Sequence, residues 1–121
     1  MGTFTKADVY ITFKNDVPNV FENRKSLNAT LRDFHTVTNP NHTGRVDIDI
    51  DSTTIDGEVA ILDIASERYS HCEFQIDLVR DYLVANYPNE VFHFDCTGWT
   101  AADDLGGNYD SDGWAELVAE A

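Results

Sequence analysis

The sequence predicts an α+β domain of ferredoxin-like βαββαβ order: a four-stranded antiparallel sheet with two helices on one face. Two observations predict it. Segments of alternating apolar and polar residues, typical of half-buried strands, are interspersed with segments whose apolar residues recur at helical spacing. The chain has 121 residues, 42% of them hydrophobic, which is enough for one domain with its own core. We assign residues 1–96 to this core domain, and residues 97–121 to an acidic, glycine-rich loop and a short C-terminal helix packed on it.

The first strand and the first helix are predicted near the start of the chain. Residues 8–14 alternate between apolar and polar side chains, as a strand with one buried face does. A turn follows, and Asn19 with Glu22 three residues later resembles a helix start. Apolar residues then recur at helical spacing, which predicts a helix over roughly 20–36, ended by the turn at 39–41.

The second and third strands are predicted as a hairpin. Residues 45–51 show the clearest strand alternation, with three apolar side chains on one face. The other face carries Asp47, Asp49 and Asp51. An Asp-Gly pair at Gly57 is a strong hairpin signal, and it leads into residues 58–64, which are apolar on both faces like a central strand. This hairpin places Ile50 opposite Asp63.

The second helix and the fourth strand follow. Ser70, with Glu73 three residues later, forms a capping box, and the segment behind it carries an apolar stripe at helical spacing. Pro88 ends this helix at about Asn86, because a proline disfavours helical geometry in the residue before it. Residues 90–96 alternate again and predict the last strand of the sheet.

The last quarter of the chain differs in composition. It is rich in glycine and acidic residues up to residues 114–120, which read as a short helix capped by Ser111 or Asp112. A terminal segment of this kind needs an apolar anchor to stay in place. We expect Trp99 or Trp114 to dock it on the core.

Formal charge is divided unevenly along the chain. Residues 1–45 hold six basic side chains and four acids, a balance of +2, whereas residues 46–121 hold two basic side chains and eighteen acids, a balance of −16. Such a block of like charge repels itself and weakens the compact state. In return it provides solubility, metal binding or attraction to a basic partner. No catalytic motif competes with this feature, so the sequence indicates a binding role.

The row of aspartates within 45–51 is the first candidate site. Alternate residues of a strand share one face, so these carboxylates would stand ~7 Å apart, close to the step between phosphates along one nucleic-acid strand. The functional interpretation is nucleic-acid mimicry. The alternative is the solvated outer face of an edge strand, where charge prevents edge-to-edge aggregation. The C-terminal acids extend the same sign of charge and favour the functional interpretation.

The predicted partner-binding surface combines this row with acidic and aromatic residues from the end of the chain. Aromatic side chains beside charges are common at interfaces, but they equally often anchor a terminal segment. The predicted partner-binding residues are Asp47, Asp49, Asp51, Asp95, Asp103, Asp104, Tyr109, Asp110, Asp112, Trp114 and Glu116. No catalytic residue, metal ligand or cofactor is predicted.

These features favour a small acidic binding protein that inhibits a nucleic-acid-binding enzyme by presenting a carboxylate surface that mimics DNA or RNA. The expected partner is a basic nucleic-acid-binding protein, either an enzyme or an effector complex. Direct binding to nucleic acid or to a membrane is not expected, and the oligomeric state is left open. In size and charge the chain resembles, as a class only, the small acidic anti-CRISPR and anti-restriction proteins of phages and mobile elements. No family motif carries that similarity.

Three alternatives stay open. An acidic domain of the halophile type would spread its acidity over the whole surface, whereas residues 1–45 are net positive. A calcium-binding domain would gather its acids around one loop. Residues 108–113 resemble the opening of an EF-hand loop, but the glutamate that such a loop needs falls one position late, at Glu120. An enzyme of ferredoxin-like fold is the third alternative, since fold does not fix function.

The two cysteines and the absence of targeting patterns indicate a compartment. Cys72 and Cys96 lie in apolar patterns, which predicts two buried free thiols in a reducing environment. His71 and His93 lie near them in sequence but on other faces, so no Cys–His nucleophile pair is predicted. No secretory signal pattern and no long apolar stretch is present. We expect a cytoplasmic protein, located in the host bacterial cytoplasm if it is phage-encoded.

Overall fold

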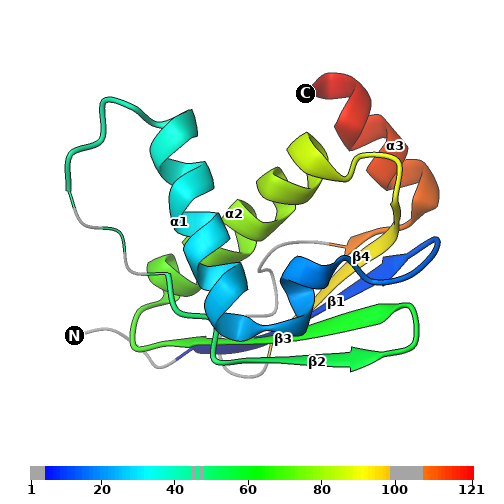
Figure 1. The fold of residues 1–121 in the computed structure, drawn as a ribbon, viewed down its shortest axis with the longest axis horizontal. Coiled ribbons are helices and arrows are strands. Elements are labelled where there is room, and N and C mark those ends of the chain that lie inside the picture. Colours follow the sequence, from blue (N-terminus) through cyan, green and yellow to red (C-terminus); the bar gives the residue numbers. More distant parts are fainter. Residues whose placement is uncertain (1–4, 45, 47, 99–107) are drawn as a thin grey trace.

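The computed structural model describes residues 5–44, 46, 48–98 and 108–121. These residues form an α+β domain around one five-stranded sheet in the order β2-β3-β1-β4-β5, with every neighbouring pair antiparallel (Figure 1). The strands are β1 (Thr5–Phe13), β2 (Ser52–Asp56), β3 (Val59–Ser66), β4 (Val91–Gly98) and β5 (Asn108–Tyr109). The helices are α1 (Arg24–Thr38), α2 (Tyr69–Asn86), α3 (Ser111–Glu120) and a short 3-10 helix before α1, η1 (Asn19–Glu22).

The predicted α+β class with an antiparallel sheet is confirmed, whereas the predicted count of four strands is wrong. The fifth strand comes from the C-terminal segment, where Tyr109 pairs with Phe94 and Asn108 pairs with Asp95 on the outer side of β4. The Asn108 side chain reinforces this pairing, because its Oδ1 accepts a hydrogen bond from the Cys96 amide at 3.2 Å. A strand of two residues is too short to produce a periodic pattern, so the sequence did not reveal it.

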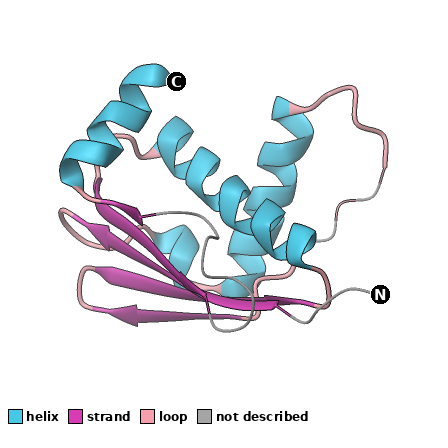
Figure 2. Cartoon of the chain, turned by 180° about the vertical axis from the view of Figure 1, so that it is seen from behind, coloured by secondary structure: helices cyan, strands magenta, loops and turns pink. Residues whose placement is uncertain are grey.

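All three helices lie on one side of the sheet (Figures 1 and 2). Every second side chain of β1, from Ala7 to Phe13, faces them and is almost completely buried. β3 and β4 add Leu62 and Phe94 to the same core. The other face of the sheet carries partly exposed side chains such as Tyr10, which is 37% exposed. The core therefore lies between the sheet and the helices, and the second face of the sheet points away from it.

The first helix begins later than predicted. The predicted helix over 20–36 is divided into η1 and α1, because Asn23 adopts an extended conformation between them (φ −132°, ψ 117°). Asn23 caps α1, and its Oδ1 accepts hydrogen bonds from the amides of Lys25 (2.9 Å) and Ser26 (3.3 Å). The helix start expected at Asn19 is therefore the start of η1 only.

The predicted hairpin is present, but its first strand lies elsewhere. Gly57 adopts φ +62° at the turn, a conformation that glycine reaches without strain. The strand predicted over 45–51 is wrong for the described residues of that span, because β2 begins only at Ser52. Ser52, rather than Ile50, stands opposite Asp63. The register thus differs by two residues from the predicted one.

The start of α2 also differs from the prediction, although its end does not. The helix begins at Tyr69, with Arg68 in the cap position and without a side chain that caps it, so the capping box expected at Ser70 is not formed. The helix ends at Asn86, as the proline at position 88 predicted. Packing of buried side chains against the sheet, rather than a local cap, therefore fixes where this helix begins.

The C-terminal helix has a different cap from either of the two predicted. Asp110 lies in the cap position, and its Oδ1 accepts a hydrogen bond from the Gly113 amide at 2.8 Å. The predicted caps Ser111 and Asp112 both lie inside the first turn of α3. An aspartate in this position satisfies an amide that would otherwise lack a partner and favours the positive end of the helix dipole.

Trp114 docks α3 on the core, which confirms one of the two expected anchors. The side chain is 2% exposed, and its ring is stacked on Phe94 with a centroid distance of 6.1 Å. Its Nε1–H donates a hydrogen bond to the Pro88 carbonyl at 3.0 Å. Trp99, the other expected anchor, lies outside the described residues. The acidic end of the chain is therefore fixed to β4 through one buried aromatic side chain.

Replacing this anchor should destabilise the whole domain. Trp114→Ala is expected to lower the free energy of unfolding by about 3–5 kcal/mol, because it leaves a cavity beside Phe94. Urea denaturation followed by circular dichroism measures the loss. The control Val37→Ala removes a side chain that is 77% exposed and should change stability by no more than about 0.5 kcal/mol. Equal stability of the two variants would show that α3 is not docked in this way.

Candidate acidic binding surface

The helical layer carries opposite charge at its two ends. Counting Lys, Arg, Asp and Glu, α1 has three basic side chains and one acid, α2 has one basic side chain and three acids, and α3 has three acids and no basic side chain. α1 and α3 lie at opposite ends of the layer, and α2 runs between them (Figures 1 and 2). The uneven charge along the sequence thus becomes a charge gradient across one side of the molecule.

The α3 row consists of three exposed carboxylates spaced four residues apart. Its members are Asp112, Glu116 and Glu120. A helix rises about 1.5 Å per residue, so neighbouring members stand ~6 Å apart along the axis. Like charges at this spacing destabilise a helix by ~0.2–0.5 kcal/mol per pair. No lysine or arginine follows Arg80 in the chain. No basic side chain of α3 itself therefore offsets the row, and its field favours a cationic partner.

The α2 row was not predicted. It consists of Glu73, Asp77 and Asp81, and the four-residue spacing on a predicted helix is the signal that would have revealed it. Arg80 lies 3.2 Å from Asp77 and 3.4 Å from Asp81, measured from guanidinium nitrogen to carboxylate oxygen. Burial raises the pKa of Asp77, Arg80 acts against this shift, and Glu73 and Asp81 add to it. The α2 row is thus partly neutralised, unlike the α3 row.

The aspartate segment, residues 48–51, packs against α1 and α2 and does not pair as a strand. Its two isoleucines are completely buried, so the predicted alternation of apolar and acidic side chains holds. The Asp51 amide donates to the Asp63 carbonyl of β3 at 2.9 Å, whereas the two amides before it bond helix side chains. The Ile50 amide donates to Asn28 Oδ1 at 2.9 Å, and the Asp49 amide donates to Gln75 Oε1 at 3.0 Å. Because the amides of residues 49 and 50 are satisfied from the helices, these two residues need no strand partner.

Two arginines of α1 lie against the aspartate segment. Arg24 donates a hydrogen bond to the Asp51 carbonyl, and Arg32 donates one to the Ile48 carbonyl. The exposed carboxylates of this segment are therefore close to two cations, which weaken their field. Asp47, predicted as a third member of the row, lies outside the described residues. The predicted strand ladder is thus a weaker source of negative potential than the α3 row.

Three of the predicted partner-binding residues serve the fold. Asp110 caps α3, Trp114 is buried, and Tyr109 is half-buried against β4. Asp103 and Asp104, predicted from the same part of the chain, lie outside the described residues. Of the predicted residues within 108–121, Asp112 and Glu116 therefore remain as candidates for partner binding, and both belong to the α3 row.

The second face of the sheet holds a pair of carboxyl groups. Asp8 on β1 stands directly opposite Asp63 on β3, and their side chains are hydrogen bonded. That bond lowers the pKa of Asp63 against the effect of burial, assisted by the Ser52 hydroxyl at 2.9 Å and by the charge of Lys6. Asp95 lies on the same face, on β4. Acidic side chains thus occupy both sides of the sheet, so the predicted residues do not all share one surface.

Both cysteines are buried free thiols, as predicted. Burial raises the pKa of Cys72 to about 11 and that of Cys96 to about 12. The Cys72 thiol donates a weak hydrogen bond to the Ile64 carbonyl at 3.8 Å. His71 is exposed while its neighbour Cys72 is buried, so the two side chains face different surroundings. These thiols have the character of core residues and not of nucleophiles.

Comparison with known proteins gives no match: no protein family fits the chain, and no curated protein or solved structure matches it significantly. None of the helices in the described ranges combines the length and apolar character that crossing a membrane requires. Within the same ranges, no group of three or more His, Cys, Asp and Glu side chains is placed to hold a metal ion.

The thiols should be unreactive in the folded protein. At about pH 8 both remain protonated because their pKa values are raised to about 11 and about 12, so a thiol reagent such as DTNB should not react with the native chain. After denaturation in guanidinium, both thiols should react. Rapid reaction of either cysteine before denaturation would contradict the burial described for it.

Asn28 should be the residue that holds the aspartate segment in place. Asn28→Ala leaves the buried Ile50 amide without its hydrogen-bond acceptor, which should cost about 1–3 kcal/mol of unfolding free energy. Urea denaturation gives the value, and Asn89→Ala at an exposed position is the matched control. If both variants unfold at the same urea concentration, the hydrogen bond from Ile50 to Asn28 does not hold the segment in place.

Proposed function

We propose that this protein is a small acidic inhibitor of a nucleic-acid-binding enzyme, which it engages through the carboxylate rows of α3 and α2. The observation that carries the proposal is the α3 row: three exposed carboxylates at regular spacing, on a helix without a basic side chain. Such a row pairs with the lysines and arginines that otherwise hold phosphates. Inhibition then follows from competition with DNA or RNA for the same cationic groove.

The spacing of the rows supports mimicry of one nucleic-acid strand. Members of each row stand ~6 Å apart along their helix, since four residues rise by about 1.5 Å each. The step between neighbouring phosphates of one strand is of the same order, because the axial rise alone is ~3.4 Å per nucleotide. Two rows from separate helices present more carboxylates than either helix alone, and this extends the number of cations that the partner can place against them.

The charge gradient of the helical layer supports an oriented encounter. A basic groove attracts the α3 end of the layer and repels the α1 end, so approach with α3 foremost is favoured. Long-range attraction of this kind raises the association rate and makes it sensitive to salt. Half-buried apolar side chains of α3 beside the row, such as Leu117, supply the contacts that slow dissociation.

The proposal includes a fold type and a biological setting. The order β2-β3-β1-β4, with α1 joining β1 to β2 and α2 joining β3 to β4, supports a ferredoxin-like core to which β5 and α3 are additions. Small size and a formal charge of −14 support a phage or mobile-element protein of the anti-CRISPR or anti-restriction type, acting in the bacterial cytoplasm. The inhibited partner is expected to be an enzyme or an effector complex.

Neutralising the α3 row should weaken partner binding while the fold is kept. The triple variant Asp112→Asn, Glu116→Gln, Glu120→Gln removes two like-charge pairs, so its stability should rise by about 0.4–1 kcal/mol, at ~0.2–0.5 kcal/mol per pair. Partner affinity should fall by about tenfold or more, because charge-assisted hydrogen bonds are lost. A pull-down from bacterial lysate at low salt, with mass spectrometry, provides the partner for these affinity measurements.

A matched control distinguishes the effect of the α3 row on binding from the effect of net charge. Asp16→Asn, Glu22→Gln and Asp33→Asn change the formal charge by the same amount, on exposed residues of the net positive part of the chain. This control should bind the partner as wild type does. If both triple variants lose the same affinity, net charge alone drives binding and the α3 row has no special role. Unchanged affinity of the α3 variant would likewise overturn the proposed site.

A further inference from the structure

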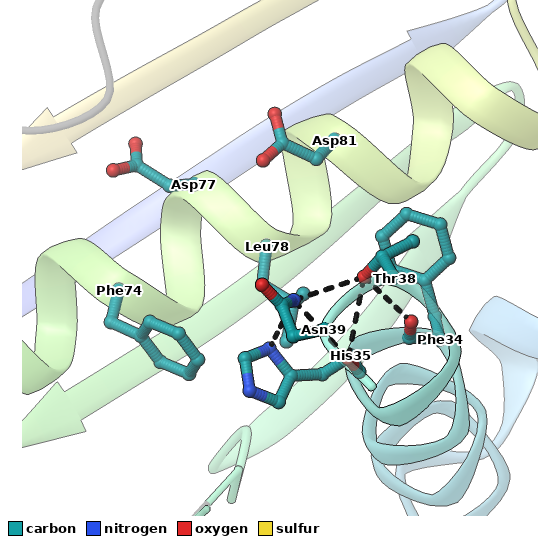
Figure 3. A pocket seen from close by; sticks show the side chains of 8 residues that line it. All are labelled: Phe34, His35, Thr38, Asn39, Phe74, Asp77, Leu78 and Asp81. Carbon is teal, nitrogen blue, oxygen red and sulfur yellow. Dashed lines mark hydrogen bonds between the residues drawn. The ribbon is translucent and has the colours of Figure 1, made fainter. Parts of the chain in front are cut away.

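A cavity between α1 and α2 supports an inference that does not depend on the α3 row. Its volume is about 400 Å³, which is within the size range of small-molecule sites, ~300–1,000 Å³. It is lined by the C-terminal part of α1 and by the middle of α2 (Figure 3). The lining residues are Phe34, His35, Thr38, Asn39, Phe74, Asp77, Leu78 and Asp81.

The apolar lining of the cavity is held by aromatic packing. Phe34 meets Tyr82 edge to face, with ring centroids 5.5 Å apart. The His35 ring lies 5.3 Å from Phe74 and 5.3 Å from His42, in both cases near perpendicular. Because each ring is fixed by a neighbour outside or across the cavity, the walls are largely preformed. A preformed apolar space suits the apolar body of a ligand.

The charged lining is negative. Asp77 and Asp81 project from α2 on the same side of the cavity (Figure 3). Arg80 contacts one oxygen of each, at 3.2 Å and 3.4 Å, and a carboxylate has about four acceptor sites, so both can accept further hydrogen bonds. Thr38 and Asn39 place the negative end of the α1 dipole at the same cavity. Two carboxylates and a helix C-terminus together favour a cation.

A buried histidine adds a second and separate indication of a ligand. His35 is 9% exposed, and its Nδ1 lies 3.2 Å from Asn39 Nδ2, which can only donate. Nδ1 is therefore the acceptor, and in the neutral ring Nε2 carries the hydrogen. This Nε2 is buried and has no hydrogen-bond partner within the described residues. An unsatisfied buried donor on the wall of a cavity is costly. A bound cation offers donors only, so the cost is relieved by a water that accepts a hydrogen bond from Nε2–H and another from the ligand.

We propose that this cavity binds a small organic cation: an amine or amidine joined to an aromatic or apolar body. The cationic group lies between Asp77 and Asp81, and the body packs against Phe34, Phe74 and Leu78. Cation–π attraction to the two phenylalanine rings adds to the ionic contacts. The site shares no residue with the α3 row, but Asp77 and Asp81 also belong to the α2 row. The titrations below use small molecules without a protein partner, so failure here leaves the proposed role of the α3 row standing.

The first test compares ligands that differ in charge alone. Phenethylamine is titrated against 2-phenylethanol, and benzamidine against benzamide, on the wild-type chain by NMR. The cations should shift the resonances of His35, Phe34 and Phe74, whereas the neutral analogues should bind about tenfold more weakly or not at all, because they lack a charge-assisted hydrogen bond. Equal binding of amine and alcohol, or no shift at these three residues with either cation, overturns the proposal.

The second test separates the cavity from general charge attraction. Asp77→Asn with Asp81→Asn should weaken phenethylamine binding by about tenfold or more. Asp112→Asn with Glu116→Gln makes the same charge change on α3 and should leave the affinity unchanged. Far-UV circular dichroism confirms that both double variants are folded. If the two double variants lose affinity equally, the cation is held by net charge and not by this cavity.

Discussion

Burial of apolar side chains against one face of the sheet is the interaction on which the rest of the structure depends, because it holds together a chain whose second half repels itself. Each acidic element has one side that is buried against the core and another that carries its carboxylates. Trp114 docks α3, the buried stripe from Cys72 to Leu83 docks α2, and two isoleucines dock the aspartate segment. The carboxylates occupy the outward side of each element. Packing, more than ion pairing, therefore fixes like charges at regular spacing, and that is the property which the proposed function uses.

Local sequence patterns predicted the elements whose formation depends on their own periodicity. They failed for elements whose position depends on contacts with residues distant in sequence. The alternation of β1, the glycine turn and the end of α2 before Pro88 are all local, and all were predicted. The aspartate segment has the alternation of a strand as well. The amides of Ile50 and Asp49 nevertheless bond Asn28 and Gln75, more than twenty residues away, and no local pattern contains that information. β5 exists only because β4 offers it an edge.

The candidate site, like the fold, could be predicted from the sequence only in part. Asp112 and Glu116 were proposed from charge alone, and the structure shows them exposed on α3. The α2 row was accessible from its spacing but was missed. Composition does not distinguish an acid that caps a helix, such as Asp110, from one that faces a partner. It also does not distinguish a buried anchor such as Trp114 from an exposed aromatic contact. The cavity beside His35 needs α1 and α2 to be packed together, so no sequence pattern could have shown it.

The charged side chains lie on two separate surfaces of the molecule. The helical layer runs from a positive α1 to a negative α3, while the second face of the sheet keeps its own carboxyl pair. Hydrogen–deuterium exchange on a complex with the proposed partner tests most directly which surface binds. Slower exchange of the amides of α3 and of the exposed turns of α2, with α1 unchanged, is the predicted result. Protection confined to α1 or to the sheet, with α3 unchanged, would contradict the central claim.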